Sequence, residues 1–154
     1  MFADCKNIND VILGDTRKLE NATGMFAGCV SLGSIEGEFS NVSKASGMFT
    51  TCSALTKFTA SNGMPKLKDA TNMFYQCGAL IEVDLGDSLE ELEVADYMFL
   101  GTSISGEFNA NMPKLKSAAG MFTRMKSTEK ITAFSSELPR LEDGMTMFEQ
   151  CTFS

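Results

Sequence analysis

The side chains in this sequence that could support metal or redox chemistry are its sulfur residues, five Cys and 11 Met. Thiolates and thioethers bind soft metal ions, and thiols also form disulfides. The stretch GMFAGCVSL, residues 24–32, places both kinds of sulfur beside a phenylalanine. The sequence contains no His, so the commonest general base near neutral pH and the commonest transition-metal ligand are both missing.

The spacing of the sulfur residues favours a structural role over a site. Metal and redox centres usually bring cysteines close together in sequence, as in C-x-x-C, whereas the first four cysteines here are 23 to 25 residues apart. We interpret the cysteines as small buried hydrophobes and the methionines as core filling. A metal or disulfide site stays the alternative, because stacked repeats would bring these thiols near one another.

The same stretch recurs along the whole chain. A Met–Phe pair occurs seven times, at intervals of 23 to 26 residues, beginning at Met1, Met25, Met48, Met73, Met98, Met121 and Met147. Around each pair the sequence approximates L-x-x-A-x-x-M-F-x-x-C-x-x-L-x-x-[VIF]. The chain is therefore predicted to form one domain of six repeats and a partial one, at 1–24, 25–47, 48–72, 73–97, 98–120, 121–146 and 147–154.

Repeats of this length cannot bury their own apolar faces, so they must stack into a solenoid. After each Cys position, apolar and polar residues alternate, as in Lys57-Phe58-Thr59-Ala60, which predicts a strand with one buried face. Around each Met the apolar spacing is three, which suits a tight turn into a short helical or 3-10 stretch. We therefore predict about six rungs, with a parallel sheet on one face and short helical or 3-10 turns opposite.

This unit resembles the BspA-like leucine-rich repeats of bacterial surface proteins and some protists. KLKDATNMFYQCGALIEVDL, residues 66–85, carries the family order of a small residue, an aromatic residue and C-x-x-L-x-x-[IVF] leading into the strand. The fifth and sixth repeats depart from it, because Thr102 and Met125 replace Cys while Ser105 and Thr128 replace Leu. The resemblance implies a right-handed, leucine-rich-repeat solenoid at the cell surface or outside the cell, used for adhesion or protein binding.

Charge narrows the possible partners. The net charge of −7 argues against non-specific nucleic-acid binding, which needs a basic surface. No apolar run approaches the roughly 20 residues of a membrane span, so direct membrane insertion is not expected. The fourth repeat, residues 73–97, holds seven acidic residues and no Lys or Arg, and so accounts for the entire net charge. Its acids form either a solvated edge or a contact surface.

The outward strand positions are the candidate contact surface. With the repeats in register, these outward positions form two columns that run across the sheet. Our candidate interaction face consists of nine residues from these columns, Ser34, Glu36, Lys57, Thr59, Glu82, Asp84, Glu107, Asn109 and Lys130. Lys57 beside Glu82 is favourable, whereas Glu82 beside Glu107 is unfavourable unless water, salt, a cation or a partner intervenes. The patch of Glu82, Asp84 and Glu107 is therefore predicted to be a contact surface or a weak Ca²⁺ site, although DLGDSLEEL lacks the spacing of an EF-hand loop.

Motifs of catalysis are missing: the chain has no G-x-S-x-G, no P-loop and no His to activate a nucleophile. We therefore expect a non-catalytic, cofactor-free and metal-free module that binds a protein or glycan, with a structural spacer as the alternative. Because residue 1 already occupies a repeat position and residues 147–154 form a truncated unit, we also expect a section of a longer array. Solenoid ends without polar caps would allow end-to-end self-association.

Overall fold

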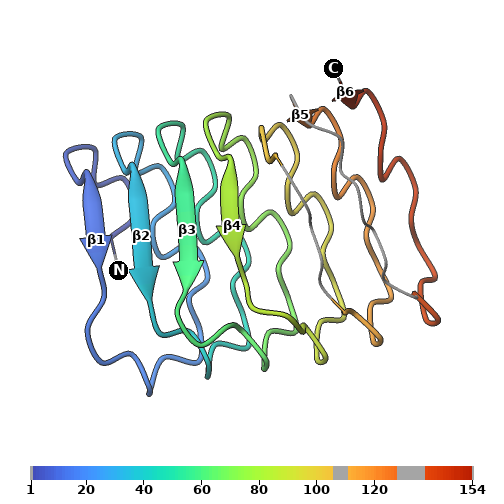
Figure 1. The fold of residues 1–154 in the computed structure, drawn as a ribbon, viewed down its shortest axis with the longest axis horizontal. Helices are drawn as coiled ribbons and strands as arrows, with labels where there is room; N and C mark the ends of the chain where they lie inside the picture. Colours follow the sequence, from blue (N-terminus) through green and yellow to red (C-terminus); the bar gives the residue numbers. More distant parts are fainter. Residues whose placement is uncertain (1, 106–110, 128–137, 154) are drawn as a thin grey trace.

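The protein winds as a solenoid whose successive turns lie side by side (Figure 1). The structure is a computed structural model that describes residues 2–105, 111–127 and 138–153. We call each turn of the solenoid a rung, numbered by the Met–Phe pair that it contains and beginning at the residue before that pair. The strands of the described residues are β1 (Asp10–Ile12), β2 (Ser34–Gly37), β3 (Lys57–Ala60), β4 (Glu82–Asp84), β5 (Lys126–Ser127) and β6 (Thr152–Phe153).

The strands pair in parallel and in the register of the sequence repeat. β1 to β4 form one sheet in chain order, and β5 pairs with β6. Asp10 pairs with Ser34, Ser34 with Lys57 and Lys57 with Glu82, so each step along the sheet is one repeat. The predicted parallel sheet is therefore confirmed in β1 to β4, and it sets equivalent residues of successive repeats next to one another.

The turns around each Met–Phe pair differ from the expectation. No helix occurs in the described ranges, so the predicted helical or 3-10 stretch is not confirmed. In the second rung the amides of Met25 and Cys29 donate to the carbonyls three residues earlier, at 3.0 and 3.1 Å. The amides of Gly24, Phe26 and Gly28 instead donate to the next rung, at 3.0, 2.9 and 2.9 Å. In a helix, all of these amides would donate to carbonyls of the same segment. In these consecutive turns, some amides donate within the rung and the others donate to carbonyls of the next rung.

Left-handed backbone at two positions of the Met–Phe turn, in each described rung after the first, makes this alternation possible. In the second rung these are Gly24 and Gly28, with φ of 60° and 73°. Glycine tolerates this conformation because it has no Cβ. The equivalent positions of the fourth rung are Asn72 and Gln76, and the one before Met98 is Tyr97, with φ of 55°.

A column of stacked phenylalanines runs through the core. Neighbouring rings have centroids 5.3 to 5.6 Å apart and planes within 11° of parallel, and they belong to Phe2, Phe26, Phe49, Phe74, Phe99, Phe122 and Phe148. Phe58 of β3 packs its tilted ring against two members of this column, Phe49 and Phe74. The column ties the turns to the inward face of the sheet.

Candidate functional site

The sulfur residues belong to this core. Cys29, Cys52 and Cys77 are fully buried, and all five cysteines are free thiols. Their equivalent positions in successive rungs make them a column rather than a cluster. Among the described residues, no group of three or more Cys, Asp or Glu side chains is arranged to hold a metal ion. The interpretation of these three cysteines as core is therefore confirmed.

The buried thiols also complete the hydrogen bonding of the turns, which the sequence did not reveal. Cys52 Sγ donates to the carbonyl oxygen of Phe26 at 3.1 Å, and Cys77 Sγ donates to that of Phe49 at 3.0 Å. Each thiol thus links its own rung to the preceding one. Burial raises the pKa of Cys52 to about 12 and raises the pKa of Cys77 as well, so both stay protonated and able to donate.

The two departures from the Cys column lie in adjacent rungs. Met125 has no S–H to donate to the carbonyl of Phe99 in the preceding rung. That carbonyl oxygen instead accepts a 2.8 Å hydrogen bond from Thr102 Oγ1 of its own rung. Thr102 and Met125 are both fully buried, so the substitutions keep the column filled. The hydroxyl makes the hydrogen bond that the thioether cannot make.

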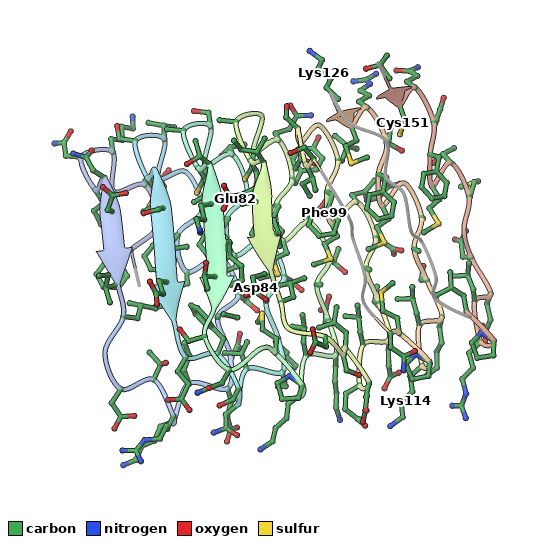
Figure 2. The ribbon with its side chains drawn as sticks, in the orientation of Figure 1. Glu82, Asp84, Phe99, Lys114, Lys126 and Cys151 are labelled. Carbon is green, nitrogen blue, oxygen red and sulfur yellow. The ribbon has the colours of Figure 1, made fainter. Side chains whose placement is uncertain are left out.

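The outward side of β1 to β4, which we call the strand face, holds six of the nine residues predicted to form an interaction face. The pairing places Ser34, Lys57 and Glu82 in one column and Glu36, Thr59 and Asp84 in the other. Figure 2 labels Glu82 and Asp84 on β4. The three remaining predicted residues, Glu107, Asn109 and Lys130, lie outside the described residues.

Polar contacts link neighbouring strands across this face. Lys57 Nζ lies 2.9 Å from Glu82 Oε2, as the sequence predicted, and Ser34 Oγ donates to Asp10 Oδ1 at 2.7 Å. The hydrogen bond to Glu82 raises the pKa of Lys57, and the negative charges of Glu82, Glu36 and Asp84 act in the same direction. Lys57 therefore stays charged in a field that is predominantly negative.

The structure also places a hollow of about 370 Å³ on the strand face. It is lined by residues of β3, of β4 and the residue before it, and of the fifth rung, namely Lys57, Phe58, Thr59, Ile81, Glu82, Val83, Asp84, Ile104 and Ser105. Four of the predicted interaction residues thus border one concavity. A concave, partly apolar surface with a few polar groups at its border is a common setting for ligand binding.

Two other acids of the fourth repeat, Glu91 and Glu93, are placed differently. Glu91 Oε1 lies 2.5 Å from Lys114 Nζ, and Glu93 Oε2 lies 2.6 Å from Lys116 Nζ. These hydrogen bonds lower the pKa of both carboxyl groups. Figure 2 shows Lys114 at the edge of the solenoid away from Glu82 and Asp84. Glu91, Glu93, Lys114 and Lys116 form what we call the paired-charge edge, where lysines of the next rung neutralise acids of the fourth.

Sequence reasoning missed a second hollow, on the side of the turns. Its volume is about 440 Å³, and it is lined by Thr50, Asn72, Tyr75, Tyr97 and Leu100. Tyr75 and Tyr97 are the two tyrosines of the chain and lie in adjacent rungs. The placement of both tyrosines in adjacent rungs was the sequence signal from which this hollow could have been predicted. The Tyr97 ring covers Gly120 of the next rung, where an added Cβ would lie 2.5 Å from the ring.

Comparison with known proteins defines the class. The family model for the BspA-type leucine-rich repeat region matches residues 1–105 with six copies. The chain therefore belongs to the BspA-type leucine-rich repeat family, which is generally associated with bacterial surface proteins. Neither the curated proteins nor the solved structures contain a match to this chain. The described residues include no apolar helix of membrane-spanning length.

Proposed function

We propose that this protein is a non-catalytic binding module of a surface protein, and that the strand face recognises a protein or glycan ligand. The observation that carries the proposal is the hollow bordered by Lys57, Thr59, Glu82 and Asp84. Inward positions of the rungs are fixed by packing, whereas outward positions differ from rung to rung. The outward side chains therefore contact the ligand, and the Met, Phe and Cys columns hold the strands that carry these side chains in place.

Localisation at the cell surface or outside the cell is part of this proposal. It is supported by membership of a family generally associated with bacterial surface proteins. Self-association through the ends of the solenoid is a separate proposal.

A structural spacer is the second candidate function. The continuous phenylalanine column and the hydrogen bonds between successive rungs favour it, because both make a stiff rod. A spacer needs no ligand of its own, so its outward residues could be exchanged without effect. The two functions therefore differ in what strand-face substitutions do.

The test is a binding screen of the whole chain against immobilised matrix proteins and an array of glycans. The strand-face variant Thr59→Ala/Asp84→Ala is compared with Thr51→Ala/Glu149→Ala, which changes exposed residues of the turns. We expect the first variant to lose the ligand that the native chain binds and the second to keep it. Retention of that ligand by both variants would refute recognition by the strand face, and a native chain that binds nothing in the screen would favour the spacer.

A further inference from the structure

The charge of the strand face narrows the class of its ligand. We propose that the strand face binds a basic, extended polypeptide segment, whose Lys or Arg side chains reach the carboxylates of β2 and β4. This inference rests on the proposed function and narrows it from a protein or glycan to a cationic protein segment. Three observations carry it: the balance of charge on the face, the absence of counter-ions for most of its carboxylates among the described residues, and the partly apolar lining of the hollow.

The first observation is the balance of charge. The outward positions of β1 to β4 carry four carboxylates and a single ammonium group, that of Lys57. The carboxylates belong to Asp10, Glu36, Glu82 and Asp84. Parallel strands lie about 4.8 Å apart, so these charges are close enough to act together on an approaching ligand. The face is complementary to positive charge and repels acidic glycans.

The second observation is that most of these carboxylates have no cation partner among the residues that the structure describes. Only Glu82 is ion-paired on the described strand face, with Lys57 at 2.9 Å. Asp84 Oδ1 accepts a 2.9 Å hydrogen bond from the backbone amide of Gly86, and within the described residues neither Asp84 nor Glu36 has an ion-pair partner. On the paired-charge edge, by contrast, Glu91 and Glu93 each have a lysine.

The third observation concerns the apolar lining. Ile81 is 42% exposed and borders the same hollow as Asp84, together with Thr59 and Ile104. Lys and Arg side chains bury their aliphatic stems on apolar surface while their charged ends stay at polar groups. A hollow with an isoleucine beside a carboxylate suits such a side chain better than it suits an inorganic cation. Arg can in addition make paired hydrogen bonds with one carboxylate.

The experiment uses the whole chain and a fluorescent peptide of alternating Gly and Arg, with Gly–Ser and Gly–Glu peptides for comparison. Glu36→Gln/Asp84→Asn removes two charges from the strand face. Glu142→Gln/Glu149→Gln removes the same number from exposed positions elsewhere, and so controls for attraction to the net charge. Binding is followed by fluorescence anisotropy at about 0.01 M and about 0.15 M salt, and folding of each variant by circular dichroism.

We expect the native chain to bind the Arg peptide and not the Ser or Glu peptides, with affinity falling as salt rises. The strand-face variant should bind it at least about tenfold more weakly, and the control variant within about twofold of the native chain. Equal losses in the two variants, or no binding of the Arg peptide by the native chain, would overturn the inference. A neutral glycan that binds in the screen and is lost with Thr59→Ala/Asp84→Ala would also overturn it, while leaving the proposed function intact.

Discussion

Removal of one ring from the phenylalanine column tests whether that column holds the rungs together. Phe74 is fully buried, with Phe49 and Phe99 stacked on its two faces at centroid distances of 5.4 and 5.5 Å. The ring of Phe58 meets its edge at 5.4 Å. Phe74→Ala therefore removes three aromatic contacts and leaves a cavity between rungs that cannot collapse without breaking the register of the sheet.

The magnitude follows from these contacts. A buried Phe→Ala change costs about 3–5 kcal/mol, and a ring contacted by aromatic neighbours on both faces and at its edge belongs at the upper end of that range. Such a loss is a large part of the roughly 5–15 kcal/mol that stabilises a typical domain. We expect the free energy of unfolding, measured by urea titration with circular dichroism, to fall by about 5 kcal/mol.

Phe148→Ala is the matched control, because this ring occupies the same column but is 48% exposed. Its truncation should cost about half as much, since the loss scales with the apolar area buried. Lys57→Ala, on the strand face, should change stability by no more than about 1 kcal/mol, because exposed ion pairs contribute little. Equal losses for Phe74→Ala and Lys57→Ala would refute the assignment of inward and outward columns.

Three further predictions concern the turns, the thiols and the paired-charge edge. Gly120→Ala should destabilise the fold by at least about 1 kcal/mol, because Gly120 has φ of 58° and the Tyr97 ring occupies the space of a Cβ. This loss of stability should be smaller when Tyr97→Ala is also present. Cys52 should resist a thiol reagent at pH 8 until the chain unfolds, because burial raises its pKa to about 12. The hydrogen bond from Lys116 lowers the pKa of Glu93, so this pair stabilises the fold above the ordinary Glu pKa of about 4.3, and the contribution is lost as pH falls through the lower folded value.

Each of these expectations has a result that would contradict it. An unchanged cost of Gly120→Ala when Tyr97 is removed would mean that the ring does not occupy that space. Labelling of Cys52 in the native chain as fast as in urea would contradict its burial. In the Glu93→Gln variant, the free energy of unfolding should decrease less steeply below about pH 4.3 than in the native chain. An identical pH dependence of the two chains in this range would show that Lys116 does not hold Glu93 ionised.

The sequence predicted β1 to β4 and their register because both follow from simple periodicities. Alternation in stretches such as residues 57–60 defines the buried face, and the repeat interval brings Lys57 beside Glu82. The turns were predicted less well, because an apolar spacing of three is shared by a 3-10 stretch and by consecutive turns. Residue types also conceal the left-handed backbone at Tyr97 and Gln76, since such bulky side chains seldom adopt it.

The candidate site was predictable in part. Membership of the strand face follows from alternation, and six predicted residues lie there in the described strands. The hollow depends on how Ile104 and Ser105 of the fifth rung sit against β4, which no pattern in the sequence specifies. Neutralisation of Glu91 and Glu93 was available in the sequence, because ELE in the fourth repeat aligns with KLK in the fifth. These four residues lie outside the strand columns, so the strand pattern does not predict their pairing.

The central claim is that ligands are recognised by the strand face, and amide chemical-shift mapping of the labelled chain with the Gly–Arg peptide tests it most directly. The account predicts shifts concentrated in β2, β3 and β4 and at residues 104–105, with little change in the turns around Met48 and Met73. Shifts centred instead on Tyr75 and Tyr97, or on the paired-charge edge, would contradict it.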